Sequence, residues 1–188
     1  MPANFTKRAI MEAFLTLAAK KSLQKITVKD IVDECGINRN TFYYHFQDIY
    51  ALVDELFLSF AENAVRDVSG GATWVEAFVS AAEEMARNRS VFMNISRSIG
   101  REKLDEYFNT VSKAVIPKLI DNHTSLSTIS ESDLAMITSF YSYAICGLWA
   151  EWLSNGMREP PRELLERISR LFSEGFYSAV RKASEGKS

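Results

Sequence analysis

The spacing of apolar residues predicts a chain built from α-helices. Apolar positions recur every three or four residues along most of the sequence, as in Leu134, Ile137, Tyr141, Ala144 and Leu148, and no sustained alternation with a period of two occurs. The pattern is interrupted near residues 22–26, 36, 47–48, 69–72, 100, 122–130 and 155–161. We therefore expect an all-α fold of about nine helices.

One short helix with clear signals at both ends is expected directly after Thr27. Thr27 is a good N-cap residue, and Asp30 follows three positions later, as in a capping box. Apolar residues then fall on one face as far as Gly36, the residue type that best tolerates the left-handed conformation after a helix. This helix is therefore expected to end after about two turns.

A second short helix is expected to begin at Asn38. Ile37 and Phe42 flank Asn38 at the positions of a hydrophobic staple, so only Gly36 and Ile37 separate the two helices. Two short helices joined by a tight, glycine-containing turn form a helix-turn-helix, whose second helix can enter the major groove of DNA.

The stretch NRNTFYYHF, residues 38–46, supplies side chains suited to such a contact. Arginine and asparagine suit base edges, whereas threonine, tyrosine and histidine suit phosphates and thymine methyl groups. We expect Arg39, Asn40 and Tyr44 to approach bases. The residues expected to hold the DNA backbone are Thr27, Lys29, Thr41, Tyr43 and His45. The alternative, in which both tyrosines only pack their rings, leaves the cap, the staple and the turn unexplained.

Charge and composition narrow the function further. The net charge is −2, yet residues 1–50 hold seven Lys/Arg against five Asp/Glu, which favours an anionic partner for this part of the chain. No apolar run suits a membrane span or a signal peptide, so we expect a cytoplasmic protein without membrane contact. Two distant cysteines and two histidines favour no disulfide and no metal site, and we expect no cofactor.

The stretch ITVKDIVDECGINRNTFYYHFQDIYALVDELF, residues 26–57, resembles the DNA-binding domain of TetR family transcriptional regulators. The resemblance implies a helix-turn-helix domain over residues 1–47 and an effector-sensing and dimerisation domain over residues 48–188, joined by a long helix beginning near Asp48. It further implies a homodimer that binds a palindromic, double-stranded DNA operator. Control would come from a small-molecule or protein effector, and repression is the more frequent mode in the family.

One residue departs from the family pattern. The family commonly has lysine three residues after the last aromatic residue of the motif, whereas this chain has Ile49, which puts one phosphate contact in doubt. Further on, SFYSYAICGLWAEWLSNGMREPPREL, residues 139–164, resembles TetR regulators of the group that includes activators of dihydroxyacetone kinase operons.

The second domain is expected to hold an effector site and the subunit contact. Large apolar side chains are dense in residues 72–120 and could line a cavity, although aromatic residues at helical spacing also build ordinary cores. The predicted effector pocket residues are Phe78, Phe92, Met93, Tyr107, Phe108, Tyr141 and Trp149. The resemblance implies a dimer interface on the last two helices, within residues 131–183; the alternative is that they only close the core of one protomer. The predicted interface residues are Gly147, Trp152, Ile168, Phe172, Gly175 and Phe176.

Two other functions remain open from the sequence. A protein-binding co-regulator would keep the same fold and act through a partner protein, which the modest basic charge and Ile49 favour slightly. A small helical enzyme is the other alternative, but no acid, base and nucleophile stand together in the sequence, so we expect no enzyme.

Overall fold

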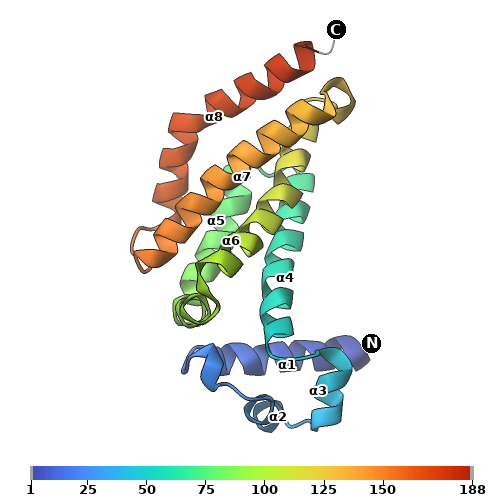
Figure 1. The fold of residues 1–188 in the computed structure, drawn as a ribbon, viewed down its shortest axis with the longest axis vertical. Helices are drawn as coiled ribbons and strands as arrows, with labels where there is room; N and C mark the ends of the chain where they lie inside the picture. The colour runs from blue at the N-terminus through green and yellow to red at the C-terminus, as the bar shows by residue number, and fades with distance from the viewer. Residues whose placement is uncertain (1, 187–188) are drawn as a thin grey trace.

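Eight α-helices and two short 3₁₀ helices make up the chain from residue 2 to residue 186, the part that this computed structural model describes, with side chains from residue 5 onward. No strand occurs in that range, which confirms the all-α prediction. The elements, labelled in Figure 1, are α1 (Pro2–Ala18), η1 (Leu23–Lys25), α2 (Val28–Cys35), α3 (Arg39–His45), α4 (Tyr50–Ser69), α5 (Trp74–Arg87), α6 (Arg89–Asp121), η2 (Leu126–Thr128), α7 (Glu131–Ser154) and α8 (Pro161–Glu185).

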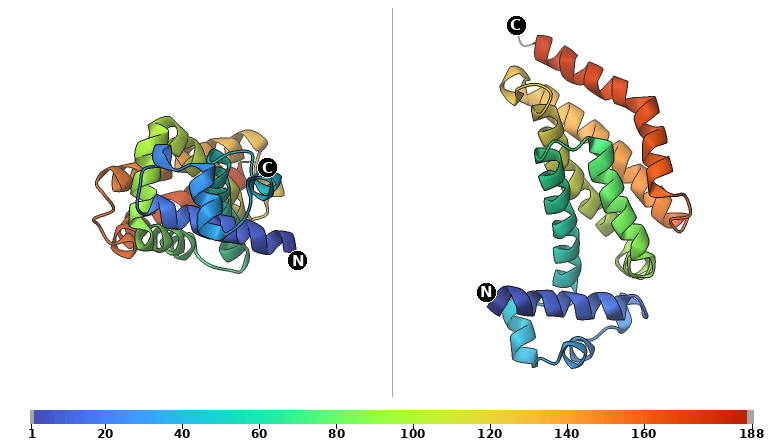
Figure 2. Two further views of the ribbon diagram at one scale, coloured as in Figure 1. Left: turned by 90° about the horizontal axis from the view of Figure 1, so that it is seen from below. Right: turned by 180° about the vertical axis from the view of Figure 1, so that it is seen from behind.

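The first three α-helices form a small unit at one end of the molecule. Each of the three helices contributes completely buried side chains to a common core: Ile10 and Phe14 from α1, Ile31 from α2 and Phe42 from α3. This core holds α2 and α3 on the side of α1 that faces away from the remaining helices, as both side views show (Figures 1 and 2).

Helix α4 joins this unit to the body formed by α5–α8. It starts beside α1, where a carboxylate oxygen of Asp48 accepts a hydrogen bond of 2.9 Å from the Ala51 N–H. From there it rises along the body (Figure 1), and Leu52, Phe57 and Ala64 lie on its buried side. The predicted long connecting helix is therefore present.

Helix α6 is divided by Gly100. This residue has φ 80°, ψ 169°, outside the helical region, and the sequence pattern indicated a break here. A second break, at Asn88 between α5 and α6, had no counterpart in the predicted breaks; there the Asn88 side chain donates hydrogen bonds to the carbonyl and carboxylate oxygens of Glu84. Because Gly100 divides α6 into two segments, the eight α-helices of residues 2–186 comprise nine α-helical segments. This number agrees with the expectation of about nine helices.

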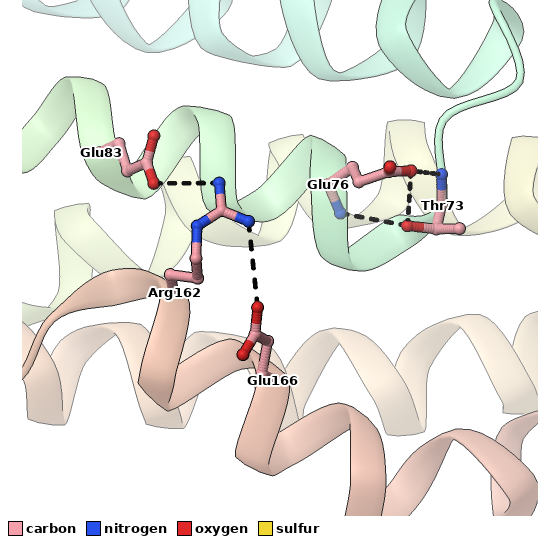
Figure 3. A network of polar contacts seen from close by, with 5 residues as sticks. All are labelled: Thr73, Glu76, Glu83, Arg162 and Glu166. Atoms are coloured by element: carbon pink, nitrogen blue, oxygen red, sulfur yellow. Dashed lines mark hydrogen bonds and ion pairs between the residues drawn. The ribbon is translucent and has the colours of Figure 1, made fainter.

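The first half of α8 is fixed against α5. The Arg162 guanidinium lies 3.3 Å from a Glu83 carboxylate oxygen of α5 and 3.9 Å from Glu166 on its own helix (Figure 3). The start of α5 is closed by a capping box between Thr73 and Glu76, drawn in the same figure. Beyond its midpoint α8 bends and continues over the η2 end of the molecule (Figure 1).

Candidate nucleic-acid interface

The start of α2 is built as the sequence predicts. The Thr27 hydroxyl accepts a hydrogen bond from the Asp30 N–H, and the Asp30 carboxylate accepts one from the Thr27 N–H at 2.8 Å, so the capping box is complete. The Lys21 ammonium lies 3.0 Å from the same carboxylate. The hydrogen bond from Lys21, followed by those from Thr27, lowers the pKa of Asp30 from its ordinary value of 3.8 to about 2.

The turn and the start of α3 also match the predicted geometry. Gly36 has φ 70°, ψ 30°, the left-handed conformation in which a side chain would be strained. Asn38 caps α3, because its side-chain oxygen accepts a 2.8 Å hydrogen bond from the Thr41 N–H. On the inner face of α3 Phe42 is fully buried, with its ring 6.1 Å from that of Phe46. Burial of these two rings fixes which face of α3 remains in solvent.

The structure brings the predicted DNA-contacting residues together on the outer face of α2 and α3. Arg39, Asn40 and Lys29 are exposed, and Tyr44 is 80% exposed. Tyr43 is also exposed and makes an edge contact with the Phe42 ring, which orients its hydroxyl outward from a fixed ring. This surface therefore presents guanidinium, amide, ammonium and phenol groups to solvent, because no other helix of the protomer covers these side chains.

Three of the predicted contacts have other partners in the structure. The Thr27 hydroxyl donates to the Asp30 carboxylate at 2.8 Å, and the Thr41 hydroxyl donates to the Asn38 side chain at 3.0 Å. His45 is half-buried, with its ring centroid 5.0 Å from that of Tyr44. The two threonines hold the helix starts in place, so Arg39, Asn40, Lys29 and the tyrosines remain as the free donors.

The beginning of α4 holds one residue that the sequence pattern did not identify. Tyr50 is the first residue of α4 and is 54% exposed, so its side chain is accessible at the start of that helix. Its neighbour Ile49 is half-buried and packs against the core, so it does not take the place of the lysine common in the family. The only feature of the sequence that pointed to Tyr50 was its position next to Ile49, which replaces the lysine common in the family.

Contacts on three helices hold the N-terminal unit against the body. The Lys7 ammonium of α1 lies 2.5 Å from the Glu55 carboxylate of α4. The neighbouring Asp54 accepts a hydrogen bond from the Tyr107 hydroxyl of α6, and both burial and this bond raise the pKa of Tyr107, so the phenol remains the donor. On the other side, the Asn94 amide of α6 donates to the Ala18 carbonyl at the end of α1 at 2.9 Å.

The predicted effector residues do not line a single cavity. Phe57 of α4 stacks on Tyr107 with ring centroids 4.3 Å apart and makes edge contacts with Phe92 and Phe108, so these side chains form an aromatic core. Phe108 in turn stacks on Trp149. Of the seven, only Phe78 and Tyr141 line the cavity of about 450 Å³ between α5, α6, α7 and α8. Met93 is half-buried on the first segment of α6.

The predicted subunit-contact residues divide into an outer and an inner set. Gly147, Phe172 and Gly175 are exposed and Ile168 is half-buried, whereas Trp152 and Phe176 are buried within the protomer. The Trp152 indole donates to the Glu159 carbonyl at 2.8 Å, and Phe176 packs on Tyr141 at 4.9 Å between ring centroids. Period and residue type could not separate the two sets, because both lie on apolar stripes.

Large exposed apolar side chains gather on the same two helices. We call this set the α7–α8 face; its members are Met136, Phe140, Tyr143, Leu171 and Phe172, each at least 60% exposed. Phe140, Leu171 and Phe172 also line one cavity together. Large exposed apolar patches are typical of protein contact sites. Most of its members had not been identified from the sequence.

The described residues offer neither a metal-ligand cluster nor a membrane-spanning helix. Among residues 2–186 no three histidine, cysteine, aspartate or glutamate side chains are grouped as metal ligands would be. In the same part of the chain, each helix is too short or too polar to cross a bilayer.

Two family models match this chain. Residues 10–56 match the model described as bacterial regulatory proteins, tetR family. Residues 72–174 match the model of a transcriptional regulator C-terminal region. A curated relative, the HTH-type transcriptional regulator YxbF of Bacillus subtilis (strain 168), is 22% identical over 191 residues; the match takes in 95% of this chain and 48% of YxbF. The chain thus spans about half the length of that relative.

Several solved structures share the fold. The dihydroxyacetone kinase operon activator DhaS has a TM-score of 0.74 at 20% identity, with 95% of this chain and 97% of that chain covered. A TetR transcriptional regulator from Streptococcus agalactiae 2603V has a TM-score of 0.62 at 20% identity, covering 90% and 94%. NalD, the secondary repressor of the MexAB-OprM multidrug efflux pump in Pseudomonas aeruginosa, has a TM-score of 0.57 at 16% identity, covering 94% and 97%. At these identities the likeness concerns the fold.

Proposed function

The chain belongs to the TetR family of DNA-binding transcriptional regulators, which are not enzymes, and from this premise we propose that it is an effector-controlled repressor of a palindromic operator. Residues 1–47 would form the DNA-binding domain, and residues 48–188 the sensing and dimerisation domain. Two copies would bind together, because one short recognition helix reads few base pairs and two-fold symmetry supplies the second half-site.

The outer face of α3 is the observation that carries the DNA-binding part of the proposal. Arg39 and Asn40 stand exposed in its first turn, and the N-terminal residues of a recognition helix are those that reach base edges. Tyr44 projects one turn further along. Lys29, near the start of α2 and exposed, would contact a phosphate rather than a base.

The dimeric part of the proposal is supported by the α7–α8 face. Its aromatic and aliphatic side chains would be covered by the same face of a second copy, as in a two-fold contact. Effector control would then act on the spacing between the two recognition helices, because α4 follows α3 in the chain after residues 46–49 and ends within the body.

The test begins with selection of operator fragments from the source genome by the purified protein. Replacing Arg39 by alanine should then cost about 1–3 kcal/mol on the selected operator and relax its sequence preference. The Lys29→Ala variant should instead weaken binding to all duplexes alike and reduce the slope of log K against log salt by about 0.9.

Mobility-shift titrations at two salt concentrations would distinguish these effects. Unchanged affinity and unchanged preference in the Arg39→Ala variant would show that this residue does not read bases. Failure of the wild-type protein to retain any fragment would instead favour a co-regulator that acts through a partner protein.

A further inference from the structure

A cavity of about 450 Å³ lies between α5, α6, α7 and α8. This volume falls within the range of about 300–1,000 Å³ typical of small-molecule sites. Ile116 and Leu119 of α6 lie at its inner end, and they are 1% and 6% exposed. At the outer end are Phe140 and Phe172, which belong to the α7–α8 face. The cavity therefore reaches from the contact face into the core.

The cavity lining is apolar, with a few polar atoms. No charged side chain is among the described residues that line it. The Tyr141 hydroxyl points toward Gly175, where an added Cβ would lie 3.8 Å from it, and it makes no hydrogen bond within residues 5–186. Burial raises the pKa of Tyr141, so this hydroxyl stays protonated. Nearby, the Ser173 hydroxyl accepts a 3.1 Å hydrogen bond from the Trp74 indole.

We propose that this cavity binds an uncharged, largely apolar small molecule that forms a hydrogen bond with the Tyr141 hydroxyl. The proposal rests on the proposed function, since it names the chemical class and the location of the effector. A carboxylate or a phosphate would lose its hydration here without gaining an opposite charge, which is strongly unfavourable. An organic cation would regain only part of its lost hydration from the aromatic rings of the lining. A neutral molecule loses little hydration and covers apolar surface.

A small molecule suits the inner part of this cavity better than a second protein copy. Ile116 and Leu119, on the α6 side of the cavity, are buried, so a helix of another protomer that covers the exposed α7–α8 face would not contact them. The second copy would instead cover Phe140, Leu171 and Phe172 at the outer end. No residue of α4 lines the cavity. The bound molecule would therefore act first on the separation of α7 and α8, and so on the geometry of the dimer.

A matched pair of fluorescent probes tests the charge requirement. N-phenyl-1-naphthylamine is neutral, and 1-anilinonaphthalene-8-sulfonate has the same two aromatic groups with an added sulfonate. Titrated into the purified full chain without DNA, the neutral probe should bind with one site per protomer. The sulfonate should bind at least about tenfold more weakly, because its charge finds no partner in the cavity.

Two cavity-filling variants test the location. Ala144 of α7 lines the cavity, and Ala135 is an exposed alanine on the same helix outside it, so Ala144→Phe is paired with Ala135→Phe as the control. Gly175→Leu fills the same cavity from α8, where only the tip of Tyr141 lies within 4 Å of the new Cβ. Circular dichroism and sedimentation identify which variants keep the helical fold and the wild-type association state.

The expected result is a loss of neutral-probe affinity of at least about tenfold in each folded cavity variant and none in Ala135→Phe. Equal affinity for both probes, or unchanged affinity in a folded cavity variant, would overturn the proposal. Saturable probe binding by a chain that retains no operator fragment would uphold the cavity site and reject the DNA-binding function. Operator binding without probe binding would reject the cavity site and uphold the DNA-binding function.

Discussion

Asp30 links the stability of the helix-turn-helix to pH. Its pKa is about 2 in the folded chain, below its ordinary value of 3.8, because Lys21 and Thr27 hydrogen-bond to the charged carboxylate. A depressed folded pKa means that the stabilisation is complete above the ordinary pKa and is lost as the pH falls through the folded one. The start of α2 therefore depends on this carboxylate being ionised.

We predict that the difference in free energy of unfolding between the wild type and Asp30→Asn is constant from pH 7 to about pH 5 and shrinks toward pH 2. Urea unfolding at a series of pH values would measure it. Asp33→Asn, an exposed carboxylate change on the same helix, is the control. A difference that stayed constant down to pH 2 would show that Asp30 is not stabilised as described.

A substitution at Ile49 tests whether the start of α4 lies near the DNA backbone. Its half-buried side chain covers apolar surface at the start of α4, and the stem of a lysine can cover similar surface while its ammonium reaches solvent. Ile49→Lys should therefore bind operator more tightly and steepen the slope of log K against log salt by about 0.9, equal to one added phosphate contact. Ile49→Met is the uncharged control. An unchanged slope would place position 49 away from the DNA backbone.

At the scale of helices, local signals in the sequence predicted those parts of the fold that depend on neighbouring residues. Thr27, Gly36 and Asn38 fix the ends of α2 and α3 through their own side chains or backbone, so the helix-turn-helix and its exposed face could be predicted. The break at Gly100 carried the same kind of signal. At Asn88 the break has no glycine or proline, and the hydrogen bonds that Asn88 makes there are with Glu84, a pair that apolar spacing does not reveal.

The candidate sites away from the DNA interface depended on tertiary packing. Phe172 and Phe176 lie four residues apart on one stripe of α8, yet the first is 60% exposed and the second 7%. Which of them is covered depends on the bend of α8 and on Tyr141 of α7. The cavity lining and the α7–α8 face therefore could not be separated from ordinary core by apolar spacing.

The first segment of α6 supports the N-terminal unit through one hydrogen bond. The Asn94 amide donates to the Ala18 carbonyl, an acceptor at the end of α1. Asn94→Ala should lower the free energy of unfolding by about 0.5–1.5 kcal/mol, and Asn94→Asp by more, because it places a second acceptor against the carbonyl. Chemical denaturation would measure both, with the exposed Arg97→Ala of the same segment as control. Equal stability of the alanine variant and the wild type would contradict the supporting role.

At the scale of the whole molecule, the proposal that the α7–α8 face forms the subunit contact predicts a change in the state of association. A glutamate at the exposed Phe172 leaves the protomer core intact but places a charge within the proposed contact, where it would lose water without a partner. Phe172→Glu should therefore be monomeric at micromolar concentration and lose most of its operator affinity. Sedimentation and mobility shifts would measure the two effects.

The matched control for this change is Leu58→Glu, which alters an exposed apolar residue of α4 away from α7 and α8. It should keep the wild-type association state. Phe176 is unsuitable for the same experiment, because it is buried beside Tyr141 and a charge there would destabilise the protomer itself. A dimeric Phe172→Glu variant with normal operator affinity would place the subunit contact elsewhere.

The length of α4 converts small rotations in the body into distances that matter on DNA. Its 20 residues span about 30 Å, so a tilt of roughly 6° about the upper end moves the lower end by about 3 Å. That displacement is close to the rise of one base pair along the duplex, about 3.4 Å. Applied in opposite directions in two protomers, the same small tilt would put the recognition helices nearly two base pairs out of step. A lever arm of this length needs very little movement at its far end to release an operator.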